Sequence, residues 1–175
     1  KSSLFDKIIV STDDDEIASL AKLNGAEVPF VRPKELADDF ANTNDVMSHA
    51  VSWMKNKKWD LETVCCFYGT SIFFNTRDLV KGKNALKNKK LSYAFSITNF
   101  NYSIFRSFTH LKDGGFKMIF PENYQTRSQD LPIAMHDAAQ FYWGKPMSWI
   151  NKENIFSDKS FGVKIPRANG IAKIV

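Results

Sequence analysis

The stretch Val64-Cys65-Cys66-Phe67-Tyr68, which runs directly into Gly69-Thr70-Ser71, decides the fold class of this chain. Five consecutive apolar or aromatic residues bounded by a polar turn with a glycine are typical of a short strand that is buried on both faces. Strands of this kind occur in parallel sheets covered by helices. The stretch therefore predicts a buried strand of an α/β sheet, with polar side chains directly after it.

Strand and helix signals alternate on both sides of this stretch. Short β-branched runs predict strands, and helices begin where Asp, Asn or Thr side chains can cap a first turn. The alternation predicts an α/β fold with three layers and a mostly parallel sheet. The predicted segments are strands at 7–11, 26–30 and 92–98, and helices after 12–15, from 43 to 53 and within 77–90.

The pattern changes after residue 99. Segments 104–111 and 116–120 flank Asp113-Gly114-Gly115, and glycine supplies the positive φ that a tight hairpin needs. We therefore expect residues 99–120 to form an antiparallel arm on the sheet. The remaining predicted elements are an aromatic strand at 140–143, a helix near 146–150 and a strand around 161–165.

Length, charge and hydropathy limit the classes of protein. The 175 residues have the size of one α/β domain, which we assign to 1–175. The formal charge of +5 comes from scattered lysines, whereas a nucleic-acid-binding protein usually gathers its basic residues on one face or tail. No apolar run approaches the ~20 residues of a membrane span, and residues 1–6 lack the layout of a signal peptide. We expect a cytoplasmic protein with no nucleic-acid or membrane partner.

Cys65 and Cys66 are the only cysteines of the chain. Neighbouring residues of a strand point to opposite faces, so a disulfide or a shared metal ion between these two is geometrically difficult. We interpret both as core thiols in a reducing compartment.

Polar residues that directly follow strands are the first candidates for a binding site, because ligands of doubly wound sheets bind beyond the carboxyl ends of the strands. Ser11 and Asp13 follow the first predicted strand, and Tyr68, Thr70 and Ser71 follow the third. Hydroxyls and a carboxylate there can bind the polar groups of a nucleoside. The competing interpretation of the first cluster is a helix cap with carboxylates at the positive end of the helix dipole, and the pattern alone favours that cap.

Two later segments supply further candidates. Arg127 lies in the polar loop 123–130, where its planar guanidinium suits bidentate binding of a carboxylate or phosphate; a surface salt bridge is the alternative. His136 and Asp137 form a possible acid/base element, but adjacent residues need not touch, and a satisfied polar pair is favoured. The chain contains no Walker-type loop, dinucleotide-binding glycine turn, nucleophile elbow, HExxH or CxxC motif.

Five segments follow one another in a characteristic order: FDKIIVSTDD (5–14), GAEVPFVRP (25–33), FPEN (120–123), TRSQDL (126–131) and HDAAQFYW (136–143). Together they resemble the acylneuraminate cytidylyltransferases, and most closely the pseudaminic acid branch of that family. The likeness covers nearly the entire chain, and the last two segments are the most distinctive.

The resemblance implies a Rossmann-like nucleotide-diphosphosugar transferase fold, a homodimer, and transfer of CMP from CTP to the anomeric hydroxyl of a nonulosonic acid, with Mg²⁺ and release of pyrophosphate. It places Ser11 and Asp13 at the cytidine end of the nucleotide and assigns no catalytic residue. The arm after Asn99 would pack across the dimer, so that the partner subunit helps to close each sugar site. The residues implied to line the sugar-acid pocket are Tyr68, Thr70, Ser71, Arg127, Gln129, His136, Asp137 and Gln140, with Arg127 near the carboxylate.

Departures from the family pattern lead us to expect impaired turnover. The family begins with a strand and a glycine- and basic-rich nucleotide loop, and this chain starts beyond that point. The family's late pair of metal-binding aspartates is not found in 168–175. Ile72 stands where a proline is usual, and Ala139 where a glycine is usual. We expect a truncated or divergent family member that turns over poorly on its own.

Two other functions stay open beside this one. The first is a transferase for another sugar acid, for which Arg127 would still favour a carboxylated sugar. The second is a non-catalytic module for sugar-nucleotide binding or dimerisation. Binding of a CMP-sugar without metal and without turnover would favour the module.

Overall fold

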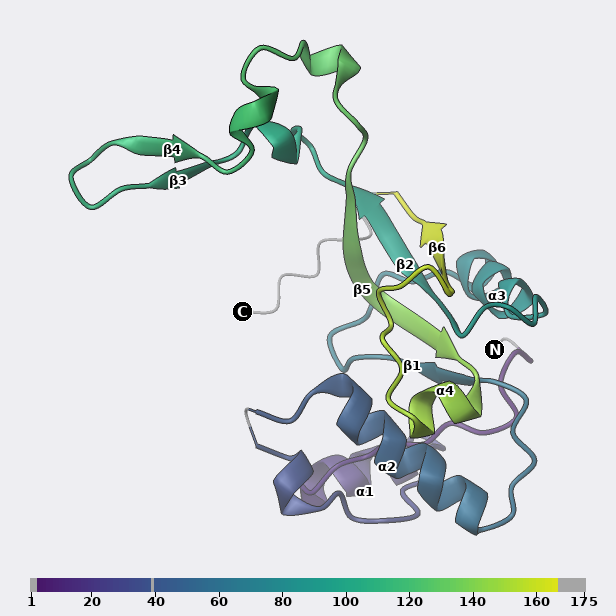
Figure 1. Cartoon of the computed structure of the whole chain (residues 1–175). Coiled ribbons are helices and arrows are strands. Elements are labelled where there is room, and N and C mark those ends of the chain that lie inside the picture. The colour runs from purple at the N-terminus through teal and green to yellow at the C-terminus, as the bar shows by residue number, and fades with distance from the viewer. Residues whose placement is uncertain (1–2, 39, 167–175) are drawn as a thin grey trace.

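The body of the molecule is a four-stranded sheet with helices on both faces, and an arm projects from one end of it (Figure 1). The structure is a computed structural model that describes residues 3–38 and 40–166. The sheet order is β1-β5-β2-β6. Its strands are β1 (Val64–Cys66), β2 (Tyr93–Asn99), β5 (Met135–Gly144) and β6 (Ser160–Lys164); the helices are α1 (Asp15–Leu23), α2 (Thr43–Asn56), α3 (Thr76–Ala85) and α4 (Pro146–Ile150).

The prediction of a mostly parallel sheet is wrong. β5 lies between β1 and β2 and pairs antiparallel with both, and of the pairings in this sheet only that of β2 with β6 is parallel. β1, β2 and β6 nevertheless run in one direction, as the alternation of strands and helices implied. β5 is the one strand of this sheet that runs in the opposite direction. Because it lies between β1 and β2, both of its pairings are antiparallel.

The two predicted N-terminal strands form a single contact. Ile9 and Glu27 make an isolated parallel bridge, in which the Val10 N–H donates to the Glu27 carbonyl at 2.9 Å and the Glu27 N–H donates to the Ile8 carbonyl at 2.8 Å. These segments therefore lie side by side as predicted. They are not strands of the four-stranded sheet.

Two element boundaries differ most from the predictions. α3 ends at Ala85 because the next amides, from Leu86 to Asn88, bond to carbonyls three residues back, which tightens the chain into turns. β5 begins at Met135 rather than near 140, because its first residues pair with the end of β2. His136 and Asp137 therefore lie within a strand and not ahead of it.

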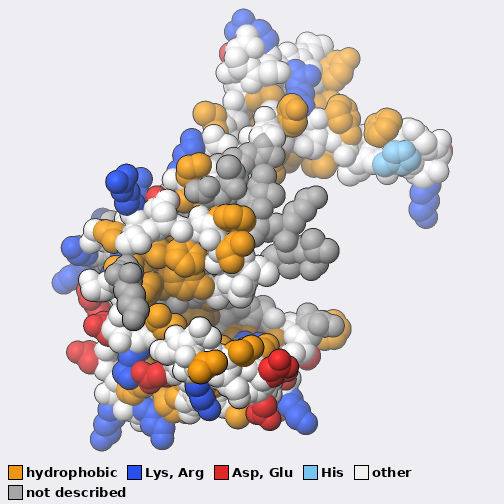
Figure 2. Space-filling model, turned by 180° about the vertical axis from the view of Figure 1, so that it is seen from behind, with side chains coloured by type: hydrophobic (Ala, Val, Ile, Leu, Met, Phe, Trp, Pro, Cys, Tyr) orange, Lys and Arg blue, Asp and Glu red, His pale blue; other side chains and the backbone are white. Residues whose placement is uncertain are grey.

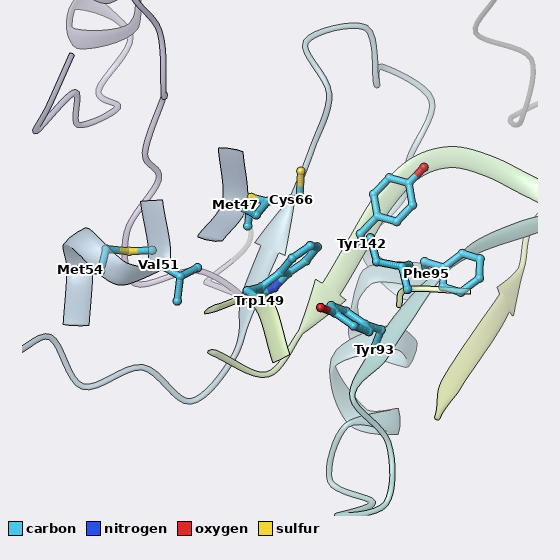
Figure 3. Close-up of a cluster of buried hydrophobic side chains, with 9 residues drawn as sticks. Met47, Val51, Met54, Cys66, Tyr93, Phe95, Tyr142 and Trp149 are labelled. Atoms are coloured by element: carbon cyan, nitrogen blue, oxygen red, sulfur yellow. The ribbon is translucent and has the colours of Figure 1, made fainter. Parts of the chain in front are cut away.

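Successive strand residues divide between two cores, one on each face of the sheet. In β2, Tyr93 and Phe95 belong to one core and Ala94 to the other. α2 and α4 cover the first core, where Val51 and Trp149 are fully buried (Figure 3), and α3 covers the second. Burial of a large apolar side chain stabilises a fold by roughly 1.5–3 kcal/mol. The two cores therefore fix the helices on both faces, as the predicted three layers require.

Gly144 ends β5 at a point where no side chain fits. A Cβ atom there would lie 2.3 Å from Nε1 of Trp149 and 2.8 Å from Cδ1 of Tyr93. We expect Gly144→Ala to lower the free energy of unfolding by about 3 kcal/mol, because the rings must leave a packed core. Urea denaturation measures this. Gly69→Ala is the control, since a Cβ there meets nothing within 4 Å, and an equal loss in both variants would contradict the argument.

The adjacent cysteines lie on opposite faces, as predicted. Cys66 is buried in the first core, Cys65 packs against the second, and both thiols are free. Burial raises the pKa of Cys66 from 9.0 to about 12 and also raises the pKa of Cys65. Both are therefore neutral packing groups at physiological pH.

Stability should fall as the pH rises above about 9. In the unfolded chain the thiols lose their protons near that value, whereas in the folded chain they keep them. Each thiol can therefore lower the free energy of unfolding by up to about 1.4 kcal/mol per pH unit. Denaturation midpoints between pH 8 and 10 test this. The double variant Cys65→Ala, Cys66→Ala should show a shallower decline, and an unchanged slope would refute the assignment.

The arm comprises residues 100–134, between β2 and β5. It contains β3 (Phe108–His110) and β4 (Phe116–Met118), which pair antiparallel around Gly114 at φ +88°, so the predicted hairpin is confirmed. The 3₁₀ turns of the arm are Ile104–Arg106, Pro121–Asn123 and Ser128–Asp130. Large apolar side chains lie open to solvent along it (Figure 2), namely Phe100, Tyr102, Phe108, Leu111, Phe116, Ile119, Tyr124 and Ile133.

Throughout the described residues, every helix is too short or too polar to span a bilayer.

Candidate functional site

The loop after β1 is tied to a bulge in β5 through a buried glutamine. The register between β2 and β5 shifts after Phe95, and Gln140, which is 1 % exposed, lies at this irregularity. Its amide oxygen accepts from the Phe73 N–H at 3.3 Å, and its amide nitrogen donates to the Ala138 carbonyl at 3.2 Å. The Ser71 hydroxyl donates to the Ala139 carbonyl at 3.0 Å. Ser71 and Gln140 are therefore brought together, and their side chains hold the loop in place.

A second cluster joins Tyr68 to the start of α2. The hydroxyls of Tyr68 and Thr43 lie 2.8 Å apart, and the Tyr68 ring lies 5.4 Å from the ring of Tyr142. The Tyr142 hydroxyl donates to a carboxylate oxygen of Asp137. Burial, followed by that hydrogen bond and the charge of Asp137, raises the pKa of Tyr142. The phenol therefore stays protonated and acts as a donor.

Asp137 has a partner on each carboxylate oxygen. One oxygen accepts from Tyr142, and the other accepts from the Ala139 N–H at 2.9 Å. A carboxylate held by two donors is fixed in orientation, which suits a positioning role. His136 makes no ion pair with this carboxylate, and its Nδ1 instead lies 2.8 Å from the Asp137 backbone carbonyl. The favoured interpretation of a satisfied polar pair, with no direct acid/base contact, is thus the observed one.

The His136 ring is oriented by two neighbours. Since a carbonyl only accepts, Nδ1 donates in this contact, and in a neutral ring Nε2 is then the acceptor. The Phe100 ring packs edge-on against the imidazole at 4.7 Å. His136 therefore presents a hydrogen-bond acceptor at the point where the arm leaves the sheet.

The predicted nucleotide cluster divides between a helix cap and an open carboxylate. Asp14 caps α1 by accepting from the Ile17 N–H at 2.8 Å, so the cap interpretation holds for this residue. Asp13 is exposed and lines a hollow of about 240 Å³. Ser11 accepts from the Arg32 guanidinium at 3.2 Å, and its carbonyl accepts from the same group.

Arg127 and Gln129 lie apart from the other candidates within one chain. Both are exposed on the arm, which Figure 1 shows projecting away from α1 and β1. The Arg127 side chain is 73 % exposed and its Nε lies 2.7 Å from Asp130. The surface salt bridge, the alternative interpretation of this residue, is therefore what a single subunit contains. Thr70 is also exposed, at the tip of the Tyr68 turn.

The family is decided by comparison with known proteins. The family described as "Cytidylyltransferase" matches residues 1–167. The chain belongs to the cytidylyltransferase family. It is therefore a nucleotidyltransferase by descent.

Two relatives and one solved structure describe the likeness of this cytidylyltransferase. It is 34 % identical over 166 residues to a pseudaminic acid cytidylyltransferase of Campylobacter jejuni, a match that covers 95 % of this chain and 72 % of the relative. It is 36 % identical over 165 residues to the Helicobacter pylori "Pseudaminic acid cytidylyltransferase and UDP-2,4-diacetamido-2,4,6-trideoxy-beta-L-altropyranose hydrolase", covering 94 % of this chain and 31 % of that one. A CMP:2-keto-3-deoxy-manno-octonic acid synthetase, solved with CTP, shares its fold at a TM-score of 0.61 and 12 % identity, covering 94 % and 75 % of the two chains.

Metal ligands are a separate question for this cytidylyltransferase. Mg²⁺ takes carboxylate and water oxygens in octahedral geometry. Among residues 3–38 and 40–166, no three His, Cys, Asp or Glu side chains converge in a way that would hold a cation. The expected change in the late aspartate pair falls on 168–175, outside the described residues.

Three partners of the site were not found by sequence reasoning. Arg32 lies in the family-like segment 25–33, Thr43 begins the predicted helix from 43 to 53, and Tyr142 belongs to the predicted aromatic strand at 140–143. The sequence predicts none of them as a site residue. The alternation of strand faces could have separated Tyr142 from Phe141 and Trp143, but no sequence signal pairs it with Asp137.

Ala139 adopts a conformation that favours glycine. Its φ of +52° lies in the left-handed region, which costs an L-residue about 1–2 kcal/mol. We expect Ala139→Gly to raise the free energy of unfolding by about 0.5 kcal/mol after the greater freedom of glycine in the unfolded chain is counted. The matched control is Ala138→Gly at a buried neighbour, which should destabilise. Thermal denaturation measures both variants. Destabilisation by both would contradict the backbone strain at Ala139.

Proposed function

We propose that this cytidylyltransferase transfers CMP from CTP to the anomeric hydroxyl of a nonulosonic acid of the pseudaminic type. The observation that carries the proposal is 34 % identity across 95 % of the chain to a relative named for that activity. In the reaction the anomeric oxygen bonds to the α-phosphorus of CTP, and the bond from that phosphorus to the oxygen bridging to the β-phosphate breaks. Pyrophosphate leaves, and the hydroxyl proton passes to water.

The cytidine end of the nucleotide is assigned to Ser11 and Asp13. The exposed Asp13 carboxylate beside a hollow can accept hydrogen bonds from hydroxyl or amino groups of a nucleoside. Arg32 holds the backbone and side chain of Ser11 together, which fixes the loop that carries Asp13. Preorganised polar groups of this kind orient a ligand at low entropic cost.

The sugar acid is assigned to the turn after β1 and the start of β5. Tyr68, Thr70 and Ser71 supply hydroxyls there, and Gln140 and Asp137 hold the loop and the strand in register. His136 offers an acceptor to a sugar hydroxyl beside them. A polyhydroxylated substrate fits a site composed of hydroxyls, amides and one imidazole.

The sugar carboxylate is assigned to Arg127, with Gln129 beside it, from the arm of a second subunit. Within one chain the arm extends away from the site, and its apolar side chains are uncovered. A homodimer in which the hairpin within 99–120 packs on its partner would cover these side chains and bring Arg127 to the neighbouring site. Exposed apolar patches of this kind commonly mark protein interfaces.

Arg127→Ala should raise the KM for the sugar acid by about 10- to 100-fold, because a charge-assisted bidentate contact is lost. The KM for CTP should stay within about twofold, since the guanidinium does not reach the nucleotide. Steady-state kinetics with pseudaminic acid measure both constants. The control is Lys112→Ala, which removes an exposed cation of the same arm.

Mixed subunits test whether Arg127 acts across the dimer. Arg127→Ala and Tyr68→Ala chains, each weakly active alone, should regain about a quarter of the wild-type activity when refolded together, because one site of each mixed dimer is intact. A mixture with only the averaged activity of its parts would place Arg127 and Tyr68 in the same subunit's site.

Release of pyrophosphate from CTP tests the reaction itself. The chain with CTP, Mg²⁺ and pseudaminic acid should release pyrophosphate in proportion to the CMP-sugar formed, more slowly than the Campylobacter relative. Turnover at the relative's rate would refute the impairment. Preference for a different sugar acid would correct the substrate, and calorimetric binding of CMP-sugar with no turnover under any condition would favour the non-catalytic module.

A further inference from the structure

A cavity of about 400 Å³ lies at the end of β1 opposite the candidate site. Residues 61–63, which enter β1, form one wall of the cavity, whereas Tyr68 and Ser71 of the candidate site follow the strand. The ends of α2 and α3 and the start of α4 form the other walls. We call it the basic cavity, and none of its lining residues belongs to the candidate site.

Lysines dominate the charge of the basic cavity. Lys55, Lys83, Lys87 and Lys145 line it, and Glu62 is the only acidic residue among the lining groups. In the described part of the chain, ion pairs use other cations, so none of the four lysines has a carboxylate within 4 Å. Gathering like charges costs free energy, which a bound anion would recover.

One of the four ammonium groups is positioned by the fold. The Lys145 Nζ donates to the carbonyls of Asn88 at 3.2 Å and Lys89 at 2.9 Å, just beyond α3, and the side chain is half-buried. An ammonium has three donors, so one N–H is left for a ligand. Lys83 is also half-buried, in the last turn of α3. Anchored cations lose less entropy on binding than freely moving surface lysines.

We propose that the basic cavity binds a small organic polyphosphate of the nucleoside phosphate class, apart from the nucleotide used in the reaction. The lysines supply the charge for the phosphates, and apolar walls that include the buried Leu86 and the exposed Met147 supply a surface for the base. The volume lies within the range of sites for small molecules. A nucleic acid needs an open basic stripe, whereas these lysines line a hollow between four elements.

Calorimetric titration of the full chain with ATP at low ionic strength tests this inference. The double variant Lys83→Gln, Lys87→Gln should weaken ATP binding by at least about tenfold, because two ammonium contacts to phosphate are lost. The matched control Lys112→Gln, Lys117→Gln removes the same charge from the arm and should stay within about twofold. The conservative pair Lys83→Arg, Lys87→Arg should keep most of the affinity, and far-UV circular dichroism confirms that each variant is folded.

The outcomes separate this site from the proposed active site. If Arg32→Ala abolishes ATP binding and the double variant Lys83→Gln, Lys87→Gln leaves ATP binding intact, ATP binds at the candidate nucleotide site. That result would overturn the inference. Equal weakening by the cavity and arm variants would show a nonspecific charge effect and also overturn it. Tighter binding of a ten-residue thymidine oligonucleotide than of ATP, lost with the same cavity lysines, would reassign the surface to nucleic acid. The CTP-dependent reaction can fail without affecting any of these results.

Discussion

The buried amide of Gln140 is the constraint on which the candidate site depends. Its oxygen is bonded to the loop after β1, its side-chain nitrogen to the bulge in its own strand, and its backbone N–H to the Ser96 hydroxyl of β2 at 2.9 Å. A buried amide without partners would cost about 1–3 kcal/mol, so these bonds hold three segments in one arrangement. The bulge in turn places the Asp137 carboxylate against Tyr142, and the loop places Tyr68 against Thr43. Local strain at Ala139 accompanies this arrangement.

The sequence was informative wherever the signal was local. The apolar run ending at Tyr68, the glycine turn of the arm and the caps of the helices each describe a short segment, and the structure has a strand, a hairpin and capped helices at these places. The strand β1 is nevertheless shorter than the run, because it ends at Cys66, and it lies at the edge of the sheet. Asp13 and Asp14 show the limit of such signals, because one residue caps the helix while its neighbour faces a hollow. A cluster of carboxylates predicts both a helix cap and a binding group, but it does not show which residue has which role.

Long-range features could not be predicted in the same way. The direction of β5 depends on how the chain returns from the arm, and no periodicity in residues 135–144 encodes it. The contacts of Tyr142 with Asp137 and of Arg32 with Ser11 depend on a bulge and on a loop crossing, respectively. Arg127 illustrates the same point, because its chemistry can be recognised from the sequence whereas its neighbours depend on assembly.

The reversed central strand also affects how the molecule can form during synthesis. Val64 of β1 pairs with Gly144, 80 residues later, so β1 has no neighbour in this sheet until the ribosome has released the end of β5. Contacts so distant in sequence carry a large loop-closure cost and slow folding. During synthesis the chain therefore exposes two apolar segments at once, namely the run at β1 and the hairpin of the arm. In a cell, that interval is when chaperones would have their main access to this protein.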